Sequence, residues 1–257
     1  MISDAVHSLS DVLATFIAMI GVRISKRGAD ADHQYGHEKF ECISSEILAG
    51  ILFVTGLGIG SVGVEKIIGG HYENLTVPGL LPLIAAIVSI VSKELIYQWT
   101  ARVGRRVQST AVVANAWHHR SDALSSIGTA IGIGGAILLG PSWRVLDPIA
   151  AVIVSVFIIK VSIQLFIPSI QELLEKSLPE DEENLIKAII LEEPGVIDPH
   201  NLRTRRIGTN RAIDVHFRMA PDTPLRMAHL ATRHIENKLR AHFGPQTFIN
   251  THVEPTK

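Results

Sequence analysis

The sequence predicts a polytopic α-helical membrane domain that is followed by a small two-layer α+β domain. Two observations predict this organisation. The chain of 257 residues is 47% hydrophobic and 19% charged, with a mean hydropathy of +0.27, which is too apolar for an ordinary soluble protein. Its apolar residues are also unevenly distributed, because long apolar stretches fill the first two thirds and shorter periodic patterns fill the last third.

Five apolar stretches are each long enough to cross a bilayer, which takes about 20 helical residues. The second and the fifth are strongly lipid-like, whereas the others carry polar residues at helical spacing and are expected to face the interior of a helix bundle. Four glycines in the second stretch suit close helix packing, namely Gly56, Gly58, Gly60 and Gly63. The predicted spans cover residues 1–24, 42–68, 77–100, 110–139 and 145–171.

The distribution of basic residues predicts the orientation. Lys and Arg gather in the links after the first and the third span, whereas segment 69–76 has none and the turn at 140–146 has one. Loops rich in Lys and Arg stay on the cytosolic side, so the last third of the chain is expected to be cytosolic. We therefore expect a transmembrane domain over residues 1–176 and a cytosolic domain over residues 177–257.

The expected cytosolic domain alternates between helices and strands. Pro179 and the acids after it indicate a helix start, because acids stabilise the positive end of the helix dipole. Apolar and polar residues alternate over 211–218 and 247–254, as in half-buried strands. With a strand over 196–207 and a second helix over 224–242, the predicted order is αββαβ, which suits a small two-layer domain.

Charge and cysteine content exclude several classes of protein. The net charge is −1, so nothing in the composition indicates a nucleic acid as a partner. Cys42 is the one cysteine of the chain, which excludes a disulfide framework within one chain and a cysteine zinc cluster. The twelve histidines therefore carry most of the functional argument.

Two histidine–aspartate pairs lie within predicted spans. His7 and Asp11 are four residues apart in the first span, so they share one helix face. His118 and Asp122 repeat this spacing in the fourth span. Ionisable groups are costly in a bilayer and usually functional there, and two imidazoles with two carboxylates can complete the tetrahedral coordination of Zn²⁺. The alternative for each pair is a structural hydrogen bond.

The residues favour a carrier over an enzyme. A catalytic zinc site keeps one position open for water, whereas four protein ligands fill the coordination shell. The sequence has no His-Glu-x-x-His motif and no Walker-type loop for ATP. Metal binds deprotonated ligands and protonation releases it, so a site exposed in turn to two pH values exchanges metal for protons. We expect no cofactor besides the transported or bound Zn²⁺ or a similar divalent cation.

Three segments resemble the cation diffusion facilitator family, and the resemblance covers essentially the whole chain. The run from Ser3 to Asp11 resembles that family's second span, the run from Ala116 to Ser126 its fifth span, and the run from Asp30 to Lys39 its first cytosolic loop. The resemblance implies proton-coupled efflux by a homodimer in a lipid bilayer, which we expect to be a bacterial plasma membrane. His-x-x-x-Asp in both spans is typical of the zinc exporters of the family, so zinc is expected, with cadmium, cobalt and iron as alternatives.

The resemblance also implies three metal sites. The transport site would comprise His7, Asp11, His118 and Asp122, and a loop site would comprise Asp30, His33 and His37. The C-terminal domain would be the family's ferredoxin-like dimerisation domain, with the ligands His216, His229, His252 and Glu254. Lys39 and Glu175 resemble a charge interlock near the membrane–cytosol junction of the dimer. The alternatives are a solvated polar loop and surface histidines on a half-exposed sheet.

The start of the chain departs from the family pattern of six spans. Only six residues precede His7, and they reach about 9 Å in a helix, whereas half a hydrocarbon core is about 15 Å. We therefore expect a truncated or misplaced start, with the first span of the family absent. This leaves open an exporter, a non-transporting membrane-anchored metal sensor or scaffold, and, least favoured, an intramembrane zinc hydrolase.

Overall fold

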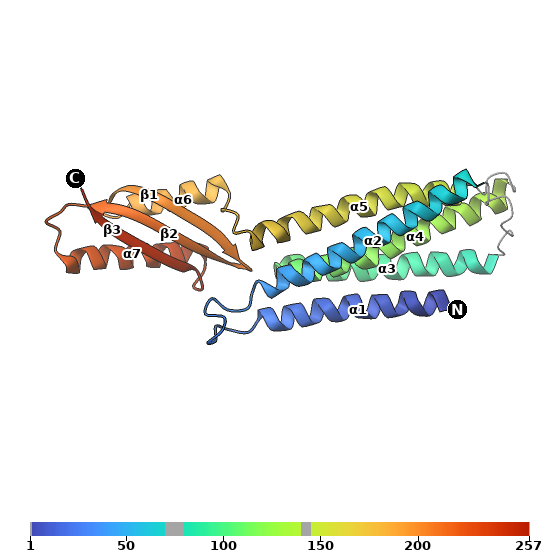
Figure 1. Ribbon diagram of the computed structural model, residues 1–257, viewed down its shortest axis with the longest axis horizontal. Helices are drawn as coiled ribbons and strands as arrows, with labels where there is room; N and C mark the ends of the chain where they lie inside the picture. Colours follow the sequence, from blue (N-terminus) through green and yellow to red (C-terminus); the bar gives the residue numbers. More distant parts are fainter. Residues whose placement is uncertain (1, 70–79, 140–144, 257) are drawn as a thin grey trace. The chain divides into compact units, whose positions relative to one another are not determined.

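The computed structural model describes residues 2–69, 80–139 and 145–256. Within these ranges, the side chains of residues 2–11, 80–82, 85, 129, 132–134 and 136–139 lie outside the description. The chain forms two compact units, Met1–Ile170 and Gln171–Lys257. The first unit is a helix bundle and the second contains a small sheet with two helices (Figure 1).

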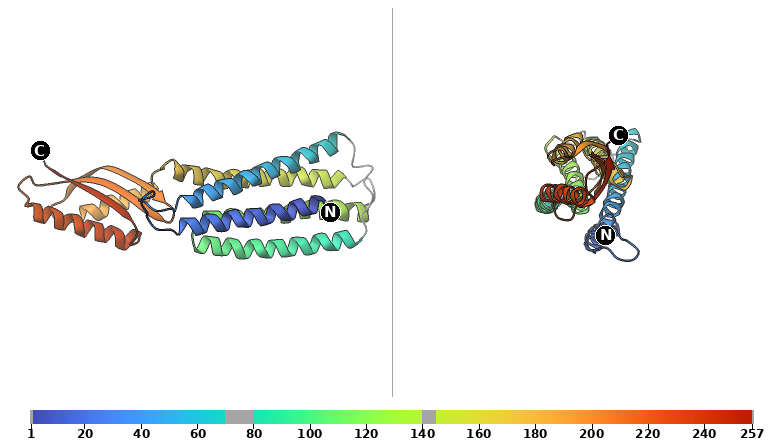
Figure 2. Two further views of the ribbon diagram at one scale, coloured as in Figure 1. Left: turned by 60° about the horizontal axis from the view of Figure 1, so that its bottom comes forward. Right: turned by 90° about the vertical axis from the view of Figure 1, so that its left-hand side faces the viewer.

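The first unit consists of long helices whose positions agree with the five predicted spans. Helix α1 packs against α2 and α4, and α4 also packs against α2 and α3. Successive helices run in opposite directions, so α1 and α3 end where α2 and α4 begin (Figures 1 and 2). The helices are α1 (Ile2–Ser25), α2 (Phe40–Ile68), α3 (Leu80–Arg106), α4 (Thr110–Leu139) and α5 (Leu146–Leu173).

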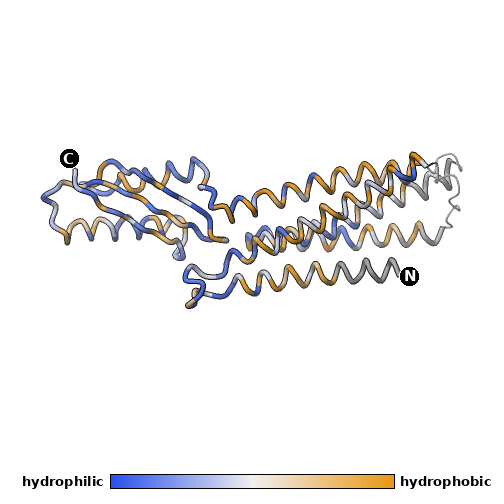
Figure 3. Tube along the Cα trace, viewed as in Figure 1, coloured by the Kyte–Doolittle hydropathy of each residue, from blue (hydrophilic) through white to orange (hydrophobic). Residues whose placement is uncertain are grey.

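The surface of the bundle is unusually apolar. Among the described residues, α2 and α5 are long and apolar enough to cross a membrane. Large apolar side chains such as Val54, Leu95 and Ile153 are more than 60% exposed, and apolar residues run along the whole length of α5 (Figure 3). Large exposed apolar surfaces are rare on soluble monomers, so this surface fits contact with lipid.

Glycines let α2 approach α5 closely. Three of the four glycines that the sequence suggested for packing meet α5, namely Gly56, Gly60 and Gly63, whereas Gly58 faces open space. A Cβ atom at Gly63 would lie 2.9 Å from Cγ2 of Val152 and 3.0 Å from the carbonyl oxygen of Pro148. Because the second of these neighbours is backbone, α5 would have to move to accommodate a side chain at Gly63.

We expect Gly63→Ala to destabilise the bundle by about 1–3 kcal/mol, the usual effect of overpacking. Gly58→Ala in the same helix is the matched control. It is expected to be neutral or slightly stabilising, because alanine has the higher helix propensity. Thermal unfolding in detergent, followed by the fluorescence of Trp99 and Trp117, measures the difference. Equal midpoints for the two variants would contradict the packing described here.

The second unit has the predicted order αββαβ. Its sheet has the strand order β1-β2-β3, in which β1 pairs antiparallel with β2, and β2 pairs parallel with β3. Helix α7 forms the crossover that a parallel pair requires. The elements are α6 (Glu180–Leu191), β1 (Ile197–Ile207), β2 (Asn210–Met219), α7 (Leu225–Phe243) and β3 (Phe248–Pro255).

The two faces of this sheet differ in polarity. On β2, the side chains of Ile213, Val215 and Phe217 are at most 1% exposed, whereas those of His216 and Arg218 alternate with them and are partly exposed. This alternation was predicted from the sequence. The core is completed by residues of the two helices, including Ile186, Ile190, Ile235 and Leu239. Both helices therefore cover the apolar face, and the polar face stays open.

Candidate metal sites

Helix α4 places an imidazole and a carboxylate inside the bundle. His118 and Asp122 lie one helical turn apart and are only 4% and 6% exposed. Asp122 forms an ion pair with Lys93 on α3, in which Nζ of Lys93 lies 3.1 Å from Oδ2 of Asp122. Helix α4 thus presents one nitrogen and one oxygen ligand at the spacing that the sequence predicted.

The other predicted pair, His7 and Asp11, lies on α1. Their side chains are outside the described residues, but α1 packs against α4. From the end of the bundle that these helices share, Asp11 lies 14 residues before Ser25 and Asp122 lies 12 residues after Thr110. At 1.5 Å per residue, these separations are about 21 Å and about 18 Å along the two helices. The two positions are therefore at nearly the same level.

A second ion pair joins α3 and α4. Oε2 of Glu94 lies 3.7 Å from Nε of Arg120. The guanidinium of Arg120 also stacks over the rings of Tyr97, at 4.4 Å from the centroid, and Trp117, at 5.2 Å. Such cation–π contacts stabilise a partly desolvated arginine. Among the described side chains, two ion pairs join α3 and α4, and the pair with Lys93 is the one that includes a predicted metal ligand.

The loop between α1 and α2 brings its three predicted ligands together. One ligand atom from each of Asp30, His33 and His37 lies within 4.8 Å of the others. Nε2 of His37 is 3.3 Å from Oδ2 of Asp30, and Nδ1 of His33 is 3.6 Å from Oδ1. His37 is buried while the other two are exposed. Two imidazoles and a carboxylate at this spacing fit a divalent cation such as Zn²⁺.

Local hydrogen bonds shape this loop cluster. The carboxylate of Asp30 accepts the backbone N–H groups of His33 at 2.7 Å and Asp32 at 3.0 Å. The bond from His33 is the main reason why the pKa of Asp30 is lowered. Nδ1 of His37 lies 3.1 Å from the carbonyl oxygen of Gly28. When Nδ1–H donates to that carbonyl, Nε2 keeps its lone pair for a metal ion.

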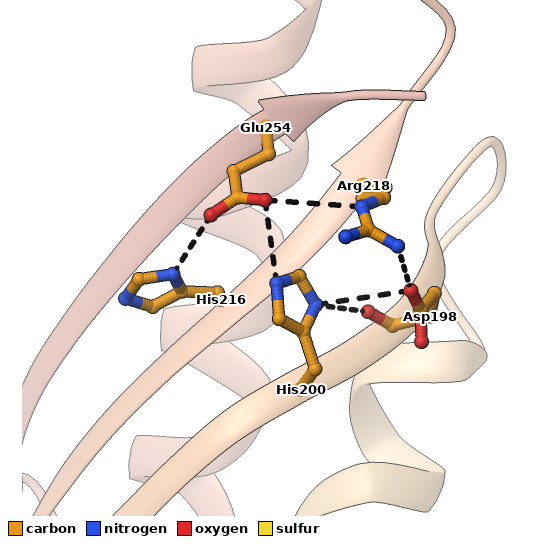
Figure 4. A network of polar contacts seen from close by, with 5 residues as sticks. All are labelled: Asp198, His200, His216, Arg218 and Glu254. Carbon is orange, nitrogen blue, oxygen red and sulfur yellow. Dashed lines mark hydrogen bonds and ion pairs between the residues drawn. The ribbon is translucent and has the colours of Figure 1, made fainter. Parts of the chain in front are cut away.

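The open face of the C-terminal sheet carries a second cluster (Figure 4). His200, His216 and Glu254, one from each strand, have ligand atoms within 4.8 Å of one another. Nδ1 of His216 donates to Oε1 of Glu254 at 3.0 Å, and Nε2 of His200 lies 3.3 Å from Oε2 of Glu254. Nε of Arg218 lies 3.8 Å from the same Oε2. Two imidazoles and one carboxylate again converge.

Strand β1 is irregular where it presents His200. Asp198 and Asn201 have φ angles of 50° and 49°, in the left-handed region that Asp and Asn tolerate better than other residues. The register with β2 shifts on both sides of His200. Nδ1 of His200 lies 2.8 Å from the carbonyl oxygen of Asp198, and Asp198 pairs with Arg218. These contacts orient the His200 ring so that Nε2 faces Glu254 (Figure 4).

The hydrogen bond from His216 is the main reason why the pKa of Glu254 is lowered. Desolvation opposes this effect, and the charges of His200, His216 and Arg218 add to it. A carboxylate with a lowered folded-state pKa stabilises the folded domain above its unfolded-state pKa, and this stabilisation is lost as pH falls through the folded-state value.

We expect His216→Ala to raise the pKa of Glu254 toward the ordinary glutamate value of about 4.3, because the main hydrogen bond is then lost. An NMR titration of the full chain with ¹³C-labelled glutamate carboxyl groups measures this pKa. His242→Ala, on α7 and outside the cluster, is the control that should leave it unchanged. An unaltered pKa in His216→Ala would show that the hydrogen bond does not form in solution.

Two further predicted ligands lie on different elements of the second unit. His252 is the register partner of His216, and the centroids of their rings are 4.8 Å apart. His229 is exposed on α7. Within the described part of the chain, neither residue joins a group of three ligand atoms, and their role in metal binding stays a prediction.

The predicted interlock residues belong to different units. Lys39 immediately precedes α2 in the first unit. Glu175 belongs to the second unit, where Oε2 lies 3.0 Å from Nε of Arg205. The charge interlock between Lys39 and Glu175 stays a prediction.

Sequence reasoning did not single out two residues of these clusters, Lys93 and His200. A lysine within a predicted span is itself a signal, so Lys93 could have been noticed. His200 has no such signal, because its approach to Glu254 depends on the irregular register of β1.

A helical membrane domain is joined to a small α/β domain, and both contain side-chain clusters that could hold a metal ion, as expected of membrane proteins that handle metal cations. Two family models make the class specific. Residues 1–174 match the cation efflux transmembrane domain, and residues 178–256 match the cytoplasmic domain of cation efflux proteins. The chain therefore belongs to the cation diffusion facilitator family, a family of transporters.

This chain is also similar to proteins from a plant, an archaeon and a bacterium. Metal tolerance protein C1 of Arabidopsis thaliana is 33% identical over 267 residues, which cover 99% of this chain and 56% of that protein. The uncharacterized transporter MJ0449 of Methanocaldococcus jannaschii is 34% identical over 241 residues, which cover 94% and 83%. The manganese efflux system protein MneP of Bacillus subtilis is 31% identical over 258 residues, which cover 98% and 85%. The chain thus spans 56% of the length of the first of these relatives.

Proposed function

We propose that this chain exports a divalent metal cation across a membrane in exchange for protons, with zinc as the preferred ion. The observation that carries the proposal is the buried His118–Asp122 pair in α4, inside a domain that matches the cation efflux family. Ionisable residues in the interior of a membrane domain are costly and mark ion pathways. A nitrogen and an oxygen ligand one turn apart suit a divalent cation.

The complete transport site in this proposal comprises the pairs on α1 and α4. His7 and Asp11 add a second imidazole and a second carboxylate, which gives Zn²⁺ the four N and O ligands that it prefers. The packing of α1 against α4 and the matching levels of Asp11 and Asp122 support this set. In this arrangement α1 to α5 each cross the bilayer.

The choice of zinc rests on the mixed ligand set. Imidazole suits zinc, whereas carboxylate oxygens also suit manganese, so cadmium, cobalt, iron and manganese can compete. MneP of Bacillus subtilis is a manganese efflux protein by name, and manganese therefore belongs in any test of selectivity.

Protons supply the driving force in this proposal. The ligands bind metal only when they are deprotonated, so binding on the side of higher pH releases protons and protonation on the other side releases metal. Alternating access of one site to both sides of the membrane then couples the two fluxes without ATP.

The second unit serves as a regulatory domain in this proposal. In this proposal the second unit has a ferredoxin-like fold and lies in the cytosol. The whole protein forms a homodimer in a bacterial plasma membrane. The cluster of His200, His216 and Glu254 and the loop cluster at Asp30 would bind the same ion from the cytosol. As the cytosolic concentration of the metal ion rises, both clusters would then bind the ion before it is exported.

Proteoliposomes with an acidic lumen and a trapped metal indicator test the proposal. We expect Zn²⁺ to accumulate in the lumen while protons leave, and Cd²⁺, Co²⁺, Fe²⁺ and Mn²⁺ to accumulate more slowly. Liposomes without protein are the control. Binding of metal without accumulation would indicate a sensor or scaffold instead. Accumulation without proton flux would contradict the antiport.

A further inference from the structure

Lys93 contacts Asp122, which is a proposed ligand of the transported cation. Its Nζ is 3.1 Å from Oδ2 of Asp122, and the side chains are 22% and 5% exposed. Lys93 lies 13 residues before Arg106, at the end of α3 that adjoins the start of α4, or about 20 Å along the helix. Lys93 is thus level with Asp11 and Asp122, in the middle of the membrane domain.

An ammonium in the middle of a membrane helix needs a counter-charge, and Asp122 supplies it. The ammonium offsets the charge of the Asp122 carboxylate, so this carboxylate is not bare when the site holds no metal. A protonated lysine has three donors and no lone pair, so it cannot act as a metal ligand. Its long flexible stem, however, allows the ammonium to move away from the carboxylate.

A divalent cation and the Lys93 ammonium compete for the negative charge of Asp122. Charges of the same sign only a few ångströms apart repel strongly in the low dielectric of a membrane domain. The ammonium already lies within contact distance of one carboxylate oxygen of Asp122, the group that would bind the metal ion. Metal binding at Asp122 is therefore expected to displace the ammonium.

We propose that Lys93 is an internal counter-ion, which occupies Asp122 when the transported cation is absent and is displaced when the cation binds. This proposal rests on the proposed function, because it takes Asp122 as a ligand of the transported ion. The competition with the ammonium sets the affinity of the site for metal. It also aids release of the ion, because the ammonium returns to the carboxylate.

The neighbouring pair Glu94–Arg120 provides a comparison that distinguishes a counter-ion role of Lys93 from a purely structural role. It joins the same two helices, but it includes no proposed metal ligand. If Lys93 only held α3 against α4, loss of either cation would have the same kind of effect on transport.

The kinetics of zinc uptake into proteoliposomes distinguish these roles. For Lys93→Met, which keeps the stem and removes the charge, we expect KM to fall about 10-fold or more, because the competing charge is gone. The maximal rate should fall several-fold, because release slows. Lys93→Arg keeps the charge and should keep a KM near that of the wild type. Arg120→Met is the matched control and should leave KM unchanged.

Each outcome of these kinetics is decisive. If the wild type takes up zinc and Lys93→Met has an unchanged or higher KM, the counter-ion proposal is wrong while the proposed function stands. If the wild type takes up none of the tested ions, the proposed function fails instead.

A second measurement uses the wild-type chain and so does not depend on how a variant folds. Acetylation of lysines by acetic anhydride, followed by mass spectrometry, reports their accessibility with and without Zn²⁺. We expect Zn²⁺ to increase the labelling of Lys93 several-fold as its ammonium leaves Asp122. Lys66, which pairs with Asp147 at 3.5 Å, is the internal control and should not change. Equal labelling of Lys93 in both states would overturn the proposal.

Discussion

Asp122→Asn is expected to lower the rate of zinc uptake by about 100-fold or more, because even residues that only support metal ligands are worth 10–100-fold. The substitution keeps the shape of the side chain but replaces an anionic oxygen ligand by a neutral amide. It also removes the carboxylate that Lys93 contacts at 3.1 Å, and breaking a buried pair from one side costs about 3–5 kcal/mol. Part of the loss could therefore come from stability alone.

The double variant Asp122→Asn with Lys93→Met separates these two causes. It removes both charges of the pair, so thermal stability should return toward that of the wild type. Zinc uptake should nevertheless stay as low as in Asp122→Asn. Recovery of uptake together with stability would show that Asp122 supports the fold and does not bind the ion.

Phe217→Ala is expected to destabilise the C-terminal domain by about 3–5 kcal/mol, as is usual for a buried phenylalanine. Phe217 is 0% exposed and lies in the core between β2 and the two helices. Each 1.4 kcal/mol corresponds to a factor of ten in an equilibrium constant, so amide exchange through global opening of the domain should accelerate about 100-fold or more.

Hydrogen exchange of the full chain in nanodiscs, followed by mass spectrometry of peptides from β1 to β3, measures this effect. Leu225→Ala is the matched control, because Leu225 is 85% exposed and exposed substitutions usually change stability by less than about 0.5 kcal/mol. Peptides of α2 and α4 should exchange as in the wild type. Unchanged exchange of β2 in Phe217→Ala would contradict the core described here.

The secondary structure of the second unit could be predicted closely because its signals are local. The alternation over 211–218 predicted a strand, and β2 covers Asn210–Met219. The second helix was predicted over 224–242, and α7 covers Leu225–Phe243. In both elements one face is apolar and the other is polar, so the apolar residues recur in the sequence with the period of a strand or a helix.

The proximity of candidate ligands within one element or one short loop also follows from local structure. His118 and Asp122 are one turn apart on a single helix, so their spacing alone places them on one face. Asp30, His33 and His37 lie within eight residues, and local hydrogen bonds bring them together.

Contacts between different elements could not be predicted from the periodicity of each element. The pairing of Lys93 with Asp122 depends on how α3 and α4 are aligned along their axes, and no local pattern fixes this alignment. His200 reaches Glu254 because β1 has two register shifts and left-handed backbone at Asp198 and Asn201. Such irregularities are set by tertiary packing, and they frequently occur at functional sites.

Anomalous diffraction at the zinc absorption edge, from crystals of the full chain grown with zinc, tests most directly whether the bundle binds the ion that it is proposed to transport. We predict a peak within about 2.0–2.2 Å of both an imidazole nitrogen of His118 and a carboxylate oxygen of Asp122, with the Lys93 ammonium displaced. Peaks at the loop and sheet clusters alone, with none beside Asp122, would contradict the account.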